Sequence, residues 1–410
     1  MNFDSRHFDQ VFSPLQRKVV SAIFLASFSV FSNAANTVRV GVSCPMTGGS
    51  ADMGISMRNG IRLAVKEIND LTGGVIGKKI ELVERDDLAN NDTGKKVAEE
   101  LVSNEKVSAT IGICNAGVGL ASIDTYQNAK VPLIIAVSAG TPLDAKFAAS
   151  PDFYIFRTSP RDEIQAPFIV AEALKRGLRK VAVFADTSVY GESGKNYIEK
   201  ALAANGLQPA SVRRFAIGVS DLSDQVAQAR NDGADVILAW TVGPEAAVLA
   251  KSVAKQKWAV PIIGSWPLSW RSFIGPSGQA AEGAQVVVSF VPQASTMQRN
   301  AFILAYQQQY DSPIIPAPMA AAQGYDAMRI LYYAIQQAKS DDPVKIKAAL
   351  EDLQKPVAGV ITTYNRPFTN KDHDALTNNM LVLGVVRNGQ IHFAYKEDEL
   401  KSFSSQRKAP

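Results

Sequence analysis

Short apolar segments alternate with helical segments along this chain, and the alternation runs through two successive series. In the predicted helix over 56–71, apolar residues recur every three or four positions and so share one face. Apolar runs joined by helices are typical of parallel strands that helices cover on both faces. We therefore predict an α/β fold with two doubly wound parallel-sheet lobes. The predicted strands are 37–42, 80–83, 109–113 and 133–137 in the first series, and 181–184, 235–240 and 260–263 in the second.

The pattern changes after about residue 285. A strand at 286–290 precedes long helical segments near 296–310, 318–338 and 344–353, and a late strand pair is predicted at about 359–364 and 380–387. Because this tail cannot make a third α/β lobe, we expect it to return to the first. The predicted N-terminal lobe is 35–158 with 291–370, and the predicted C-terminal lobe is 159–290 with 371–400. Three hinge crossings are expected near 157–160, near 289–292 and at about 365–380.

The amino terminus has the order of a secretory signal peptide. Residues 1–18 are polar and end in Arg17-Lys18, an apolar run covers 19–31, and small residues follow up to Ala34. The apolar run is shorter than the roughly 20 residues that a helix needs to cross a bilayer. We predict a signal peptide over 1–34 and an exported product, with an amphipathic or membrane-anchoring helix as the alternative.

Charge and cysteine content limit the possible partners. The chain has 43 basic and 39 acidic residues, a formal net charge of +4, without a basic stripe that would predict nucleic-acid binding. Cys44 and Cys114 are the only cysteines. Export permits one disulfide between them, and two buried thiols are the alternative.

Sequence motifs for catalysis, metals and cofactors are missing. We find no His-Glu-x-x-His or paired Cys-x-x-Cys, no Gly-x-Ser-x-Gly, and no phosphate-binding glycine loop. His373 and His392 are predicted to be surface or capping residues. We expect a protein that is not an enzyme and has no metal or cofactor. A hydrolase using only carboxylates, with Asp86, Asp87 or Glu67, is the alternative.

The carboxyl ends of the predicted strands are where a ligand would bind in open parallel sheets. The third strand ends at 114–117 and the fourth at 138–142, each before a helix start. Small residues at a helix start leave backbone N–H groups uncovered, which suits a carboxylate. The second lobe would contribute 186–190, 240–243 and 265–266.

At these residues the chain resembles the periplasmic branched-chain amino-acid-binding proteins, the receptors of a class of ABC importers. The resemblance implies two lobes joined by three crossings that close over a small ligand, with the importer's membrane permease as partner and a monomer as the simplest state. It is carried by "VRVGVSCPMTG" at 38–48, "GIRLAVKEI" at 60–68, "GGVIGKK" at 73–79, Arg85-Asp86-Asp87, "PLIIAVSAGTP" at 132–142 and Tyr190-Gly191.

The resemblance also implies a set of ligand contacts. Met53 stands where the family places a large side chain against the ligand, and Tyr190 matches a tyrosine that closes the far side of the cleft. Thr141 could instead cap a helix, and Tyr190 could be a packed surface residue. The ligand carboxylate would be held by Asn115, Ala116, Ala139, Gly140 and Thr141.

Two positions depart from the family's pattern. In amino-acid-binding members of the family an acidic side chain holds the ligand ammonium, and Trp266 stands at or beside the position of that acid. Those members also have a tyrosine after the preceding strand, where this chain has a stretch that begins with Thr241. An ammonium buried without a countercharge is costly, whereas an aromatic face favours a flat apolar body. A tryptophan can also hold a cation, Trp266 could lie in the lobe core, and Glu245 near the cleft rim could replace the missing acid.

From these residues we predict the solute-binding receptor of an ABC importer of the branched-chain amino-acid type. Its ligand is predicted to carry a carboxylate, with an aromatic or other organic acid favoured. The alternatives are a Leu/Ile/Val-like amino-acid-binding protein of the same family and a periplasmic sensor without transport.

Overall fold

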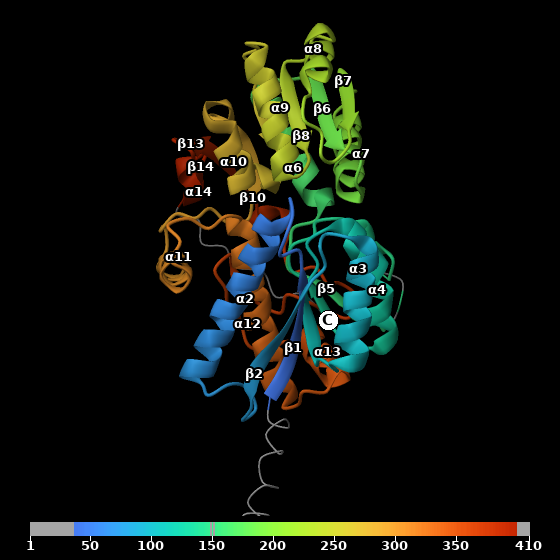
Figure 1. Ribbon diagram of the computed structural model, residues 1–410, viewed down its shortest axis with the longest axis vertical. Coiled ribbons are helices and arrows are strands. Elements are labelled where there is room, and N and C mark those ends of the chain that lie inside the picture. Colours follow the sequence, from blue (N-terminus) through green and yellow to red (C-terminus); the bar gives the residue numbers. More distant parts are fainter. Residues whose placement is uncertain (1–36, 148–149, 151, 400–410) are drawn as a thin grey trace, which may run out of the picture. The chain divides into compact units, whose positions relative to one another are not determined.

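The computed structural model describes residues 37–147, 150 and 152–399 (Figure 1). The first lobe is built on a five-stranded sheet with the order β2-β1-β3-β4-β5. The pairs β1–β3, β3–β4 and β4–β5 are parallel. The strands are β1 (Thr37–Cys44), β2 (Lys79–Asp86), β3 (Ala109–Gly112), β4 (Leu133–Ile135) and β5 (Ile155–Arg157).

Helices cover both faces of this sheet because its strands are apolar on both sides. Ile134 belongs to the core that contains α2 and α12, while Leu133 and Ile135 pack with α3 and α4. Figure 1 shows these two pairs of helices on opposite sides of the strands. The helices of this lobe are α2 (Ala51–Leu71), α3 (Asn91–Glu99), α4 (Ala116–Ala129), α5 (Pro142–Ala145), α11 (Met297–Tyr310), α12 (Pro318–Ala338) and α13 (Pro343–Glu351), with a π-helical turn η2 (Glu100–Asn104) after α3.

The second lobe is built on a seven-stranded sheet with the order β14-β13-β10-β9-β8-β6-β7. Its strands from β10 through β7 are parallel, and β13 and β14 add an antiparallel edge. The strands are β6 (Val181–Asp186), β7 (Ser211–Phe215), β8 (Val236–Trp240), β9 (Ile262–Gly264), β10 (Gln285–Val288), β13 (Val382–Arg387) and β14 (Gln390–Phe393).

Helices again cover both faces of the second sheet. Ile169 of α6 and Ile198 of α7 share one core, and Val226 of α8, Leu249 of α9 and Phe273 of α10 belong to the other. The predicted fold class, two α/β lobes with parallel sheets, is confirmed. The helices are α6 (Asp162–Lys175), α7 (Val189–Ala204), α8 (Ser223–Asn231), α9 (Gly243–Lys255), α10 (Arg271–Ser277) and α14 (Lys396–Glu399), with short 3₁₀ turns η3 (Trp266–Ser269), η4 (Gly278–Ala281) and η5 (Asn378–Met380).

The predicted pairing of the two late strands is wrong. Strands β11 (Val357–Ala358) and β12 (Thr363–Tyr364) form a two-stranded sheet of their own, and β13 joins the second sheet instead. The partner of β13 in its hairpin is β14, which the sequence analysis did not predict. The two segments lie in different lobes, and periodicity carries no information about which sheet a strand joins.

Helices α2 and α12 lie side by side because glycines let their backbones approach closely. A Cβ atom at Gly60 would lie 2.0 Å from the carbonyl oxygen of Ala321, and one at Gly324 would lie 2.4 Å from that of Met57. The return of α12 to the first lobe therefore holds α2, whose first turn faces the second lobe.

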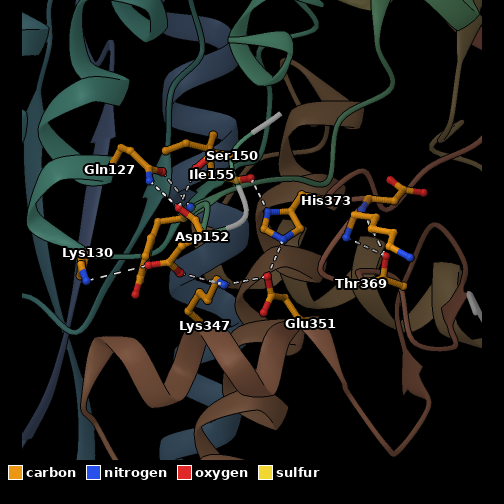
Figure 2. A network of polar contacts seen from close by, with 12 residues as sticks. Gln127, Lys130, Ser150, Asp152, Ile155, Lys347, Glu351, Thr369 and His373 are labelled. Atoms are coloured by element: carbon orange, nitrogen blue, oxygen red, sulfur yellow. Dashed lines mark hydrogen bonds and ion pairs between the residues drawn. The ribbon is translucent and has the colours of Figure 1, made fainter. Parts of the chain in front are cut away.

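His373, in the segment that leads to β13, contacts strand β5 and the end of α13 (Figure 2). Its ring stacks between Phe153 and Phe156, with ring centroids 4.1 and 3.9 Å away. Nδ1 lies 2.9 Å from the carbonyl oxygen of Ile155, and Nε2 lies 3.1 Å from Oε1 of Glu351. His373 is buried, so its prediction as a surface or capping residue is wrong.

A chain of ion pairs continues from this histidine. Lys347 Nζ lies 2.9 Å from Glu351 Oε1 and 3.1 Å from Asp152 Oδ1. The two neighbouring backbone segments are also joined, because Arg157 N donates to the His373 carbonyl at 2.9 Å and Ala375 N donates to the Arg157 carbonyl at 2.8 Å. These bonds fasten the chain before α6 to the segment that leads to β13.

The predicted signal peptide, 1–34, lies outside the described residues. Among the helices that the structure describes, none has both the length and the apolar character that crossing a bilayer requires.

Candidate ligand-binding cleft

A cavity of about 390 Å³ lies where strands of both sheets end. Every segment that lines it follows the carboxyl end of a strand, as expected for open α/β sheets. Its volume is in the range of sites for small molecules. The first lobe contributes Ser50, Met53, Ala89, Asn91, Cys114, Asn115, Ala116, Gly117, Ser138 and Ala139, and the second lobe contributes Thr187, Ser188, Val189, Tyr190, Ile217, Val242, Trp266, Pro267 and Trp270.

Six of the nine predicted contact residues line this cavity: Met53, Asn115, Ala116, Ala139, Tyr190 and Trp266. The other three, Gly140, Thr141 and Thr241, are buried beside it and are not in its lining. The Gly140 carbonyl accepts a hydrogen bond from Arg157 Nη2 at 3.0 Å, and Thr141 Oγ1 accepts one from Glu163 N at 3.3 Å. That all nine contact a ligand stays a prediction.

The first-lobe wall presents polar groups at the start of α4. Asn115 is the N-cap residue of α4, but its side chain makes no capping bond and instead donates from Nδ2 to Ser50 Oγ at 3.2 Å. The small residues Ala116 and Gly117 follow it in the cavity wall. Among the described residues, Asn115 Oδ1 and Ser138 Oγ have no hydrogen-bond partner. This wall can therefore offer backbone N–H groups and a hydroxyl to an anion.

The second-lobe wall is mostly apolar and contains three aromatic rings, those of Tyr190, Trp266 and Trp270. Trp266 and Trp270 are buried and meet edge to face, with ring centroids 4.8 Å apart and planes at 71°. Tyr190 lies 5.9 Å from the ring of Trp240, and burial raises the pKa of its hydroxyl well above the usual value, with nearby Asp162 adding to the shift. This wall suits an apolar ring more than a charged group.

The lining residues that the structure describes include no Asp, Glu, Lys, Arg or His. Glu245, considered above as a substitute acid, is buried near the start of α9 and lies outside the lining. Its Oε1 accepts a hydrogen bond from Gly218 N at 2.8 Å, next to the cavity residue Ile217. The carboxylate of Glu245 therefore supports the loop after β7.

The loop after β2 was missed in the sequence analysis, although it contributes Ala89 and Asn91 to the cavity. Two neighbouring acids shape it. Asp86 Oδ1 accepts from Met46 N at 2.9 Å and Leu88 N at 2.8 Å. Asp87 Oδ1 accepts from Ala89 N at 2.9 Å, and burial raises the pKa of Asp87 to about 6. Applying the strand-end rule to β2 would have found this segment.

Trp270 is a further cavity residue that was not among the predicted contacts. It is buried, it lines the cavity, and its ring meets that of Trp266 edge to face. The signal available in the sequence was its position four residues after Trp266 in the loop that follows β9.

Cys44 and Cys114 are both buried free thiols, so the structure contains the second of the two alternatives left open above. Burial raises the pKa of both thiols well above the usual value. Cys114 Sγ lies 3.9 Å from Met57 Sδ, and Cys114 also lines the cavity. Both thiols therefore behave as apolar packing groups.

Residues 37–390 match the model of the periplasmic binding protein family. The chain belongs to this family. A Leu/Ile/Val-binding protein homologue of Brucella melitensis is 26% identical over 349 residues, covering 84% of this chain and 92% of the relative. The family consists of solute-binding proteins, which work with ABC transporters.

Solved structures of periplasmic binding proteins have the same fold. A leucine binding protein from Thermotoga maritima superposes with a TM-score of 0.77 at 24% identity, covering 88% of this chain and 99% of that one. A solute binding protein of an ABC transporter from Rhodopseudomonas palustris, in complex with 3,4-dihydroxybenzoic acid, gives a TM-score of 0.76 at 22% identity, covering 87% of this chain and 95% of that one.

Proposed function

We propose that this periplasmic binding protein captures a small carboxylate-bearing acid, with an aromatic acid favoured, for an ABC importer. The observation that carries the proposal is the uncharged cavity lining, which joins polar groups at the start of α4 to a second-lobe wall that contains three aromatic rings. A free amino acid would bring both a carboxylate and an ammonium into this space. An acid without an amino group brings only the negative charge of its carboxylate, which the backbone N–H groups of the first-lobe wall can bind.

The carboxylate would bind at the start of α4. Backbone N–H groups of a helix start, together with hydroxyl donors such as Ser138, stabilise a negative charge without a basic side chain. The body of the ligand would then extend toward Trp266 and Trp270. Edge-to-face and offset stacking with these rings favours a flat apolar body.

An ammonium would lack a countercharge in this cavity. Burying an unpaired charge is costly, and no acidic side chain is present in the described lining. The cation-binding capacity of a tryptophan face lowers this cost without supplying a formal charge. The lining thus favours acids without an amino group over amino acids.

The comparisons are compatible with both ligand classes. One structural relative is a leucine binding protein and another was solved with 3,4-dihydroxybenzoic acid, and both are under 25% identical to this chain. Likeness at that level concerns the fold, so the ligand class rests on the cavity residues.

The wider mechanism is part of the same proposal. The two lobes, taken as 35–158 with 291–370 and 159–290 with 371–400, would close by a hinge at the three crossings. The protein would act in the periplasm as a monomer that delivers its ligand to the membrane permease. Closure is then a population shift toward the form in which both cavity walls contact the ligand.

Thermal unfolding against a ligand panel tests the ligand class. The panel should contain benzoate and its hydroxylated forms, phenylalkanoates, short aliphatic acids, and leucine, isoleucine and valine. A ligand at about 100 times its dissociation constant stabilises the folded protein by about 2.7 kcal/mol. The methyl ester of the best acid is the matched control, because it keeps the ring and removes the charge.

Stabilisation by aromatic acids, and not by their esters or by amino acids, is the expected result. Stabilisation by amino acids alone would overturn the proposed ligand class. Glu245 would then be the acid to examine, since its Oε2 is buried and has no hydrogen-bond partner among the described residues. Loss of amino-acid binding in Glu245→Gln would support that second function.

A further inference from the structure

Two consecutive backbone N–H groups of the second lobe are bound by groups of the first lobe. Ser272 N donates to Asp52 Oδ2 at 2.9 Å, and Arg271 N donates to the Pro316 carbonyl at 2.8 Å. Ser272 lies in α10 of the second lobe, Asp52 lies in the first turn of α2, and Pro316 lies in the segment between α11 and α12. Both hydrogen bonds therefore span the two lobes.

The Asp52–Ser272 bond lies beside the ligand cavity. Met53 follows Asp52 in the chain and lines the first-lobe wall, while Trp270 precedes Ser272 by two residues and lines the second-lobe wall. In Figure 1, α10 lies across from the start of α2. The bond thus joins two segments that each present a side chain to the cavity.

We propose that Asp52 is a closure residue, whose carboxylate binds Ser272 N–H when the lobes close and so stabilises the ligand-bound form without contacting the ligand. We call this pair the rim clamp. The inference rests on the proposed function in that it assigns the clamp to closure over the cleft ligand.

The energetics favour the closed form specifically. A hydrogen bond to a charged acceptor contributes more than one between neutral groups. When the lobes separate, Ser272 N–H and Asp52 return to water and the bond is lost. Asp52 still lies in the first turn of α2, where a negative charge is favourable in either form, so its charge does not oppose opening or closing by itself.

A bond made only in the closed form raises affinity mainly by slowing dissociation. Removing the carboxylate with Asp52→Ala should raise the dissociation constant and the dissociation rate constant of the best panel acid about tenfold, the lower end for a charge-assisted hydrogen bond. Asp52→Asn keeps an acceptor oxygen and loses the charge, so its effect should be smaller, about threefold.

Stopped-flow binding and the distribution of lobe separations provide the test. Spin labels on cysteines introduced at the exposed residues Lys95 of α3 and Ala204 of α7 report the separation, because Cys44 and Cys114 are buried. Asp224→Ala is the matched control, since it removes an exposed acid from the first turn of α8, away from the cavity. Each variant is measured with and without ligand.

We expect Asp52→Ala to have a smaller closed population than the wild type and Asp224→Ala, with faster ligand release and a nearly unchanged association rate constant. Equal closed populations in all three proteins would overturn the rim clamp. If no panel acid binds, the proposed ligand class is rejected. The closed populations of the three ligand-free proteins then still test the rim clamp. If binding is normal and the populations are equal, the proposed function stands and the clamp is rejected.

Discussion

At the scale of single residues, Trp266 and Asp87 show how burial sets the chemistry of this cleft. Trp266 occupies the loop after β9 with its ring against Trp270, where an amino-acid-binding relative is expected to have an acid. Asp87 is fully buried under the loop that carries Ala89 and Asn91 into the cavity. One substitution can remove the aromatic ring of Trp266, and another can remove the buried carboxyl group of Asp87.

Trp266→Ala removes half of the aromatic pair. We expect the best aromatic acid to bind about 10- to 100-fold more weakly, a loss of about 1.4–2.8 kcal/mol, because the ligand ring loses a packing surface. Isothermal titration calorimetry measures the change. Trp258→Ala is the control, since Trp258 is half-buried and outside the cavity lining; equal affinity in the two variants would remove Trp266 from the site.

Asp87→Asn tests the raised pKa of Asp87. Burial raises this pKa to about 6 in the folded protein, whereas an unfolded Asp titrates near 3.9. The bound proton therefore stabilises the folded protein below about pH 4, and the contribution is lost as the pH rises through 6. Between pH 4 and 7 we expect the free energy of unfolding of the wild type to fall relative to that of Asp87→Asn by up to about 3 kcal/mol.

Denaturant unfolding at several pH values measures this difference. Burial also raises the pKa of Asp326 to about 6, but Asp326 is present in both proteins and its effect cancels. Asp92→Asn, at an exposed residue, should follow the wild type at every pH. Parallel curves for the wild type and Asp87→Asn would show that Asp87 is ionised normally in the folded protein.

At the scale of elements, the contact between α2 and α12 places the cleft's first-lobe residues. The N-cap residue Ser50 and Met53 in the first turn of α2 line the cavity, and α12 holds α2 through the close approach at Gly60 and Gly324. Such an approach tolerates no side chain, because the nearest atoms belong to the facing backbone.

Gly60→Ala should therefore destabilise the protein by about 1–3 kcal/mol. A methyl group there would meet the Ala321 carbonyl oxygen at 2.0 Å, so the two helices must separate. The helical Gly275 is the control, since no atom lies within 4 Å of a Cβ added there, and Gly275→Ala should be neutral or stabilising by up to about 1 kcal/mol. Similar chemical-denaturation midpoints for the two variants would contradict this account.

At the scale of the whole molecule, the two lobes depend on how the chain crosses between them. The ring of His373 lies between Phe153 and Phe156. Arg157 N donates to the His373 carbonyl, and Ala375 N donates to the Arg157 carbonyl. The segment before α6 and the segment before β13 are thereby held together, which limits the paths along which the lobes can move.

His373→Ala should lower the free energy of unfolding by about 3 kcal/mol, because a buried ring is replaced by a methyl group. His373→Phe keeps the stacking and loses the contacts to Ile155 and Glu351, so we expect a smaller loss. His392→Ala, at a half-buried position on β14, is the control and should cost less than about 1 kcal/mol. An unchanged unfolding free energy in His373→Ala would show that the histidine does not fasten the crossing.

The sequence by itself determined the two α/β lobes and the general place of the cleft. Apolar runs such as 133–137 and 181–184 and the helix over 56–71 are local patterns, and the ends of parallel strands meet at one edge whatever the details of packing. The individual contacts Met53, Asn115, Ala116, Ala139, Tyr190 and Trp266 came from the resemblance to a known family, whereas the strand-end rule gave the segments in which most of them lie.

Only the tertiary structure decided which neighbouring side chains face the cavity and which serve other contacts. Gly140 and Thr141 bind groups of the segment that leads into the second lobe, Glu245 binds the backbone of Gly218, and His373 is enclosed by aromatic rings. The pairing of β13 with the second sheet was likewise decided only by the tertiary structure. Each depends on partners far away in the sequence, and local periodicity contains no information about them.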